Sequence, residues 1–158
     1  MSGIIDSAGS RSGVIGTTEL DYEEGSFPCG LDNSADDGTF YVNSGYTLLA
    51  YTKIGRLVQI QGYIQAYAAT GCTGTIEMTG LPFLPADIPI PAGHPGAGTD
   101  RPDFNPIYVH CRGTGSTDLI ASGIVTPNTT YIQLEFITAA DVQAGTGFYV
   151  TGSYTTNL

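Results

Sequence analysis

The run from Tyr46 to Tyr67 constrains the fold more than any other stretch, because it is the longest strand-like pattern in the chain. Lys53-Ile54-Gly55-Arg56 interrupts it and predicts a hairpin turn in which Gly55 has a positive φ angle. Beyond that turn apolar and polar side chains alternate, which is typical of a strand with one buried and one wetted face. The residues expected to point inward are Val58, Ile60, Ile64 and Ala66. This hairpin is therefore predicted to form the centre of an antiparallel sheet.

Other short strand-like segments follow at regular spacing, separated by turns rich in Gly, Asn and Pro, and no segment has a helical period of 3.6. This pattern predicts an all-β fold, an antiparallel jelly-roll-like sandwich of about eight strands. In the seventh strand, Ile132, Leu134 and Phe136 are expected on one face, opposite Gln133 and Glu135. The expected strands are Thr39–Val42, Tyr46–Thr52, Leu57–Ala66, Gly74–Met78, Ile107–Arg112, Leu119–Val125, Thr130–Thr138 and Phe148–Tyr154.

The segment from Leu81 to Pro106 is the exception, because it carries seven of the nine prolines and cannot donate a regular ladder of N–H groups. We expect a long loop here. Its first part, Pro82-Phe83-Leu84-Pro85, is predicted to form an apolar corner across one end of the β domain.

Residues 1–30 differ from the rest, so the chain is divided into an N-terminal arm with its hinge (1–30) and a β-sandwich domain (31–158). The arm is rich in Gly and Ser and has two aliphatic pairs without strand or helix periodicity. Two interpretations stay open: a disordered tail, or an extended arm whose aliphatic residues bind another protein. The residues expected to contact such a partner are Ile4, Ile5, Arg11, Val14, Ile15, Leu20 and Tyr22.

Charge limits the classes of partner. The formal net charge is −10, and five Lys and Arg residues are too few for a phosphate-binding patch or an anionic membrane surface. Eight carboxylates fall within the first 38 residues, either as a solvated segment or as a surface for a basic partner. The three cysteines form no CxxC pair, and we expect no disulfide framework, no signal peptide and no membrane span, which indicates synthesis in the cytoplasm.

Catalytic and metal-binding patterns are weak, so we expect no enzyme, no cofactor and no metal. His94 and His110 have no partners at zinc-ligand or nucleophile spacing. Residues 32–43 resemble a calcium loop at three positions but lack its Gly and its final Glu, which favours a polar turn. A glycosidase-like carboxylate pair among Glu77, Asp118 and Glu135 stays open. The outward tyrosines, suited to protein or sugar contacts or to cross-strand pairing, are Tyr63, Tyr67, Tyr108 and Tyr131.

Four segments carry a family resemblance: SGIIDSAGSRSGVIG, TELDYEEGSF, GYTLLAYTKIGRLVQIQGYI and GLPF, all within residues 1–83. Together they resemble small virion surface proteins of tailed bacteriophages, of the head-decoration or tail-fibre type. Such proteins often have Trp after the hinge glycine, where this chain has Ser26-Phe27. The resemblance implies a jelly-roll-like domain, a homotrimer, and an N-terminal segment that attaches it to the particle.

Placement on the virion is open between two sites. An arm followed by one compact domain favours a capsid decoration or cement protein that docks on the major capsid protein and stabilises the head. The alternative is a tail fibre, knob or receptor-binding protein, and a module that binds or cleaves host glycans is a third possibility. Either of the first two implies a location on the virion surface, other virion subunits as partners, and no nucleic acid or membrane.

Overall fold

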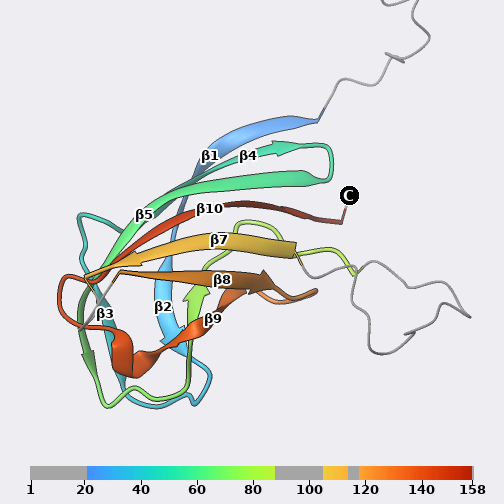
Figure 1. The fold of residues 1–158 in the computed structure, drawn as a ribbon. Helices are drawn as coiled ribbons and strands as arrows, with labels where there is room; N and C mark the ends of the chain where they lie inside the picture. The colour runs from blue at the N-terminus through green and yellow to red at the C-terminus, as the bar shows by residue number, and fades with distance from the viewer. Residues whose placement is uncertain (1–20, 88–104, 114–117, 158) are drawn as a thin grey trace, which may run out of the picture.

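The computed structural model describes residues 21–87, 105–113 and 118–157, which form an antiparallel all-β body with one short 3-10 helix, η1 (Ala139–Asp141) (Figure 1). The predicted all-β, antiparallel fold is confirmed. The strands within this part of the chain are β1 (Tyr22–Pro28), β2 (Gly30–Asn33), β3 (Thr39–Val42), β4 (Leu48–Ile54), β5 (Leu57–Thr70), β6 (Thr75–Thr79), β7 (Asn105–Arg112), β8 (Leu119–Val125), β9 (Tyr131–Thr138) and β10 (Gly147–Thr155).

The strands form one continuous hydrogen-bonded path in the order β1-β4-β5-β10-β7-β8-β9-β6-β2, and β3 pairs with the second half of β5. The two ends of this path, β1 and β2, are separated in sequence by Cys29 alone. One bent segment therefore pairs with β4 on one side and with β6 on the other. This brings the two edges of the sheet together, so the sheet nearly closes into a barrel (Figure 1).

The predicted central hairpin is present. β4 and β5 pair from Leu49 opposite Gly62 to Ile54 opposite Leu57, and the turn residue Gly55 has a φ of 58°. All four residues predicted to point inward on β5 are fully buried. A glycine is required at the turn because a side chain is strained at this φ.

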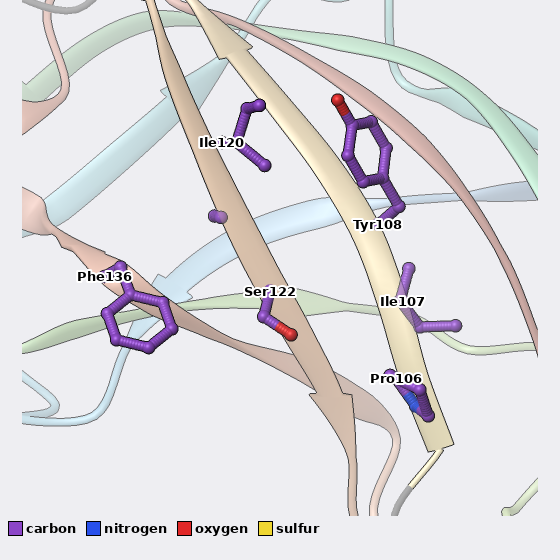
Figure 2. A pocket seen from close by; sticks show the side chains of 7 residues that line it. Pro106, Ile107, Tyr108, Ile120, Ser122 and Phe136 are labelled. Atoms are coloured by element: carbon purple, nitrogen blue, oxygen red, sulfur yellow. The ribbon is translucent and has the colours of Figure 1, made fainter.

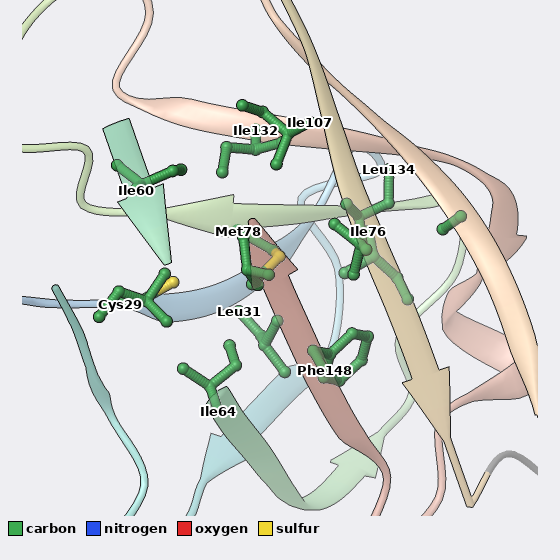
Figure 3. Close-up of a cluster of buried hydrophobic side chains, with 14 of the residues drawn as sticks. Cys29, Leu31, Ile60, Ile64, Ile76, Met78, Ile107, Ile132, Leu134 and Phe148 are labelled. Atoms are coloured by element: carbon green, nitrogen blue, oxygen red, sulfur yellow. The ribbon is translucent and has the colours of Figure 1, made fainter. Parts of the chain in front are cut away.

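The interior of the barrel is filled by aliphatic and aromatic side chains from nearly every strand, and Figure 3 shows them converging from opposite walls. Fully buried side chains include Leu49, Ile64, Ile76, Met78 and Phe148. Each fully buried aliphatic or aromatic residue of this kind contributes about 1.5–3 kcal/mol of transfer free energy. The body therefore has a core of its own.

Large and small residues alternate across one layer of this interior. The register runs from Ile60 to Gly152, then to Ile107, Gly123 and Leu134 on five successive strands. A Cβ atom on Gly152 would lie 2.7 Å from Ile107 Cδ1, and one on Gly123 would lie 3.2 Å from Ile107 Cβ. Ile107 therefore fills the space that these two glycines leave, as in other small barrels with tapered interiors.

The predicted apolar corner lies at one end of the barrel. The hydroxyl of Tyr154 donates to the carbonyl oxygen of Phe83 at 3.1 Å, and Thr156 Oγ1 donates to the carbonyl oxygen of Leu84 at 2.7 Å. Pro85 forms an isolated bridge with Thr156. These bonds fix the segment against the last strand, while residues 88–104 of the predicted loop lie outside the described residues.

The strand predictions were close in the second half of the chain and incomplete at its start. Thr39–Val42 and Leu119–Val125 match their predicted bounds, and the other six predicted strands differ by a few residues. The sheet begins at Tyr22, so the segment assigned to the arm and hinge (1–30) contains β1 and the first residue of β2. Phe27 and Cys29 of this segment are buried in the core. Residues 1–20 lie outside the described residues.

Candidate functional site

The described residues hold no group of three or more His, Cys, Asp or Glu side chains that could bind a metal ion. Glu77 lies on β6 and Glu135 on β9, where Glu135 pairs in register with Ser122. Asp118 Oδ1 accepts a hydrogen bond from the Gly113 N–H at 3.3 Å. Glu77 and Glu135 thus lie on paired strands, and Asp118 lies beside Gly113 before β8. Within the part described, no helix is long and apolar enough to cross a membrane.

The turn that resembled a calcium loop is organised by a side-chain amide. Asn33 Oδ1 accepts hydrogen bonds from the N–H groups of Ala35 and Asp37, and its Nδ2 donates to the Asp37 carbonyl oxygen. The Asp37 carboxylate accepts bonds from the hydroxyl and N–H of Thr73, which lower the pKa of Asp37. These contacts build the polar turn that the sequence favoured.

Two carboxylates face each other across β2 and β6, where Asp32 pairs in register with Glu77. Partial burial, with the nearby charges of Asp32 and Asp36, raises the pKa of Glu77. Like charges directly opposite in a sheet destabilise it. This pair is therefore a local cost to the fold.

Two of the three cysteines, Cys29 and Cys111, are packed in the hydrophobic core, and Cys72 is partly exposed. Cys29, Cys72 and Cys111 are free thiols, and burial raises the pKa of Cys29 and of Cys111 to about 12. A thiol with so high a pKa is not nucleophilic near neutral pH.

Of the residues predicted to bind a partner, Tyr22 alone lies within the described part of the chain. Ile4, Ile5, Arg11, Val14, Ile15 and Leu20 lie outside it. Tyr22 is on β1, 57% exposed, and its hydroxyl donates to Glu24 Oε2 at 2.6 Å. It pairs in register with Ile54, which pairs with Leu57, and all three side chains are exposed. We call these three residues the root trio.

The backbone just before β1 is fixed to the body. The Asp21 carbonyl oxygen accepts a hydrogen bond from the Gly55 N–H at 2.7 Å, and its carboxylate forms an ion pair with the buried Lys53. The Lys53 ammonium also lies 5.6 Å from the centre of the Phe83 ring.

On the same strand as Lys53, the Tyr51 hydroxyl donates to Glu23 Oε1 at 2.6 Å, and this hydrogen bond raises the pKa of Tyr51. Residues 21–23 are thus held by contacts to β4 and to the turn after it, and the β4 residues Lys53 and Tyr51 also pack against the Phe83 ring.

A row of aromatic residues crosses the outer face of the barrel. Tyr63, Tyr149, His110 and Ile120 lie in direct register on β5, β10, β7 and β8. The rings of Tyr63 and Tyr149 are 4.7 Å apart, those of Tyr149 and His110 are 5.8 Å apart and stacked, and Tyr46 packs edge-on against Tyr63 at 5.4 Å. The predicted cross-strand pairing of outward tyrosines is therefore present for Tyr63.

This row ends beside an apolar hollow of about 390 Å³ on the outer face of β7, β8 and β9 (Figure 2). Phe136 projects at one rim and is 83% exposed, and Ile120 is 66% exposed. Tyr108 lines the opposite side. Large apolar side chains this exposed and this close together form an apolar patch, a feature typical of binding surfaces.

Phe136 points outward, so the prediction that it shares the inward face with Ile132 and Leu134 is wrong. Thr75 pairs with Thr138 and Glu77 with Gln133, so two steps along β6 correspond to five along β9. Such a bulge redirects side chains, and Phe136 takes a φ of 66° and points outward while Ile137 is buried. The adjacent Phe136-Ile137 pair was the available signal, because two consecutive strand residues cannot both face the core.

Charge divides the outer surface into two sides. The five neighbouring strands β4, β5, β10, β7 and β8 carry no Asp or Glu, and we call them the neutral side. The acidic side comprises β1, β2, β6 and the turn between β2 and β3, where Glu23, Glu24, Asp32, Asp37 and Glu77 lie among others. The row of aromatic residues and most of the hollow belong to the neutral side.

Comparison of this chain with protein-family models, with curated proteins and with solved structures finds no match in any of the three.

Proposed function

We propose that this protein is a non-enzymatic structural component of a bacteriophage virion, a capsid decoration or cement protein that docks on the major capsid protein. In this proposal the segment before Asp21 is an attachment arm, and the body stabilises the head from outside. The jelly-roll-like classification, the homotrimer and the location on the virion surface belong to the same proposal, as does synthesis in the host cytoplasm.

The observation that carries the proposal is the construction at the start of the sheet. Asp21 is held to Lys53 and to the Gly55 N–H, so any segment before it leaves the body from a fixed point. The exposed root trio lies beside that point. A partner bound to residues 1–20 is therefore in reach of an apolar surface on the body as well, and joining two contacts raises the effective concentration of the second.

A filled interior also favours a binding role over a catalytic one. The core consists of packed aliphatic and aromatic side chains, and the described residues hold no group of three or more His, Cys, Asp or Glu side chains placed to bind a metal ion. Such a body suits adhesion through its outer face.

The test measures binding to purified particles that contain this protein. Quantitative mass spectrometry should find many copies per particle. After the native protein has been stripped, the wild-type chain should rebind, and Leu57→Thr with Ile54→Thr should bind about tenfold or more weakly, because two exposed apolar anchors are removed. Tyr41→Thr, which removes an exposed tyrosine from β3, should bind like the wild type.

Absence of the protein from particles would contradict a virion role. Presence at a few copies, located at the tail, would replace the cement role with the alternative of a fibre, knob or receptor-binding protein. The row of aromatic residues supports that alternative, because rigid amphipathic rings on an outer face suit contacts with proteins and sugars.

A further inference from the structure

The neutral side is unusual for a chain with a net charge of −10. Fifteen carboxylates are present, yet five adjacent strands carry none, and their outer residues include Tyr, Gln, Thr, Ser, Ile and a single Arg112. Two copies of the chain repel each other wherever their carboxylates meet. The neutral side allows two copies to approach with few carboxylates opposite one another, since β7 and β8 carry none and the adjoining β9 carries only Glu135, which pairs with Ser122.

The same surface holds a projecting ring and a space for one. Phe136 stands outside the sheet at the rim of the 390 Å³ hollow, whose walls include Ile120 and Tyr108 (Figure 2). Contact of the Phe136 ring with water contributes no favourable free energy. An aromatic residue buries about 150–250 Å² when it enters an apolar pocket. Ring and hollow lie next to each other, so a second copy that presents the same face supplies both at once.

The backbone conformation of Phe136 is strained, which indicates that the position of this side chain serves a role besides folding. Its φ of 66° lies in the left-handed region, where a bulky residue is a genuine outlier. A strained backbone conformation persists when the surrounding structure imposes it, and such strain gathers at binding sites. The bulge in β9 supplies that constraint by inserting residues opposite β6.

We propose that copies of this chain associate through the outer face of β7, β8 and β9, with Phe136 of one copy packed against Ile120 and Tyr108 in the hollow of the next. This interface does not depend on the virion role. It explains by one contact both the exposed, strained phenylalanine and the absence of carboxylates from β7, β8 and the strands beyond them, with Glu135 of β9 at the edge of the contact.

Phe136→Gly tests the proposal, because interface and fold respond in opposite directions. Glycine accepts a positive φ, so the variant should be at least as stable to denaturant as the wild type. Removal of a central aromatic anchor should weaken self-association about 30-fold, measured by analytical ultracentrifugation of the full chain. Tyr41→Thr, which removes an exposed tyrosine that lies outside this face, should leave association unchanged.

A pair of charge variants gives a second measurement. Ser122→Asp places a carboxylate in the hollow, and Ser26→Asp places one on the outer face of β1. The first should separate the copies, and the second should not. Added salt should strengthen association of the wild type, since it screens the repulsion between the acidic sides.

The proposal is overturned if the full chain is monomeric throughout the micromolar range, or if it associates and Phe136→Gly and Ser122→Asp leave that association unchanged. It is also overturned if Phe136→Gly lowers stability while association is retained, because Phe136 would then serve the fold. A monomer whose Phe136 becomes protected only when virions are added would assign the hollow to a different protein.

Discussion

The neutral and acidic sides of this barrel share one interior and differ in almost everything outside it. On the neutral side, outward positions carry aromatic, amide and hydroxyl groups, and Tyr63, Tyr149 and His110 contact each other in register. On the acidic side, Asp32 and Glu77 face each other at a cost to the fold. The difference shows that the inward-facing side chains of each strand suffice for the fold. The outward-facing side chains can therefore differ, with repelling carboxylates on one side of the barrel and contacting aromatic rings on the other.

The largest expected effect tests whether the interior is shared. Phe148→Ala on β10 and Ile76→Ala on β6 each remove a fully buried side chain, one from each side of the barrel. Each should lower the free energy of unfolding by about 2–5 kcal/mol, measured by urea denaturation. A loss below about 1 kcal/mol for one of them would show that this side is loosely packed, and the comparison would fail.

An intermediate effect tests the glycine-lined layer of the neutral side. A Cβ on Gly152 would come within 2.7 Å of Ile107 Cδ1, so Gly152→Ala should cost about 1–3 kcal/mol of stability. Ile107→Val removes that carbon and alone should cost about 0.5–1.5 kcal/mol. The double variant should be more stable than the sum of the two losses implies, which a double-mutant cycle measures. Simple additivity would mean that the two residues do not compete for space.

The smallest effect concerns the acidic side and has the opposite sign. The pKa of Glu77 is raised in the folded state, so its ionised form lowers stability above that pKa, and the cost disappears below the unfolded value near 4.5. Glu77→Gln should therefore raise the free energy of unfolding at pH 7 by about 0.2–1 kcal/mol.

The gain from Glu77→Gln should vanish near pH 4, because Glu77 is then largely protonated in both states. Denaturation curves at the two pH values measure this difference. Glu135→Gln is the matched control, since Glu135 faces Ser122 and has no carboxylate opposite. An equal gain from both variants would point to net charge and not to the pair.

Local sequence patterns predicted most of the fold, because the alternation within a strand and the residue preference of a turn depend only on residues that are close in sequence. The turn at Gly55 and the inward face of β5 followed from such patterns. β1 did not, since its residues Tyr22-Glu-Glu-Gly-Ser lack alternation and become a strand only by pairing with β4. The near closure of the sheet depends on that pairing, which is a contact between distant segments.

The row of aromatic residues and the hollow beside it were predicted only in part for the same reason. Tyr63 and Tyr108 were identified as outward from alternation alone. Phe136 was misplaced because the bulge in β9 depends on its register with β6, which the sequence of β9 does not contain. The charge division was visible only as an excess of carboxylates near the N-terminus, because strand order decides which strands are neighbours.

The continuous segment of β1 and β2 has a mechanical consequence. β1 is paired with β4 over seven register positions and passes through Cys29 directly into β2, which is paired with β6. Tension applied at residue 21 along the strand axis would load those pairs in shear, all together, instead of peeling them apart one by one. Force from a tether at this end would thus be shared between the β1–β4 pairing and the β2–β6 pairing.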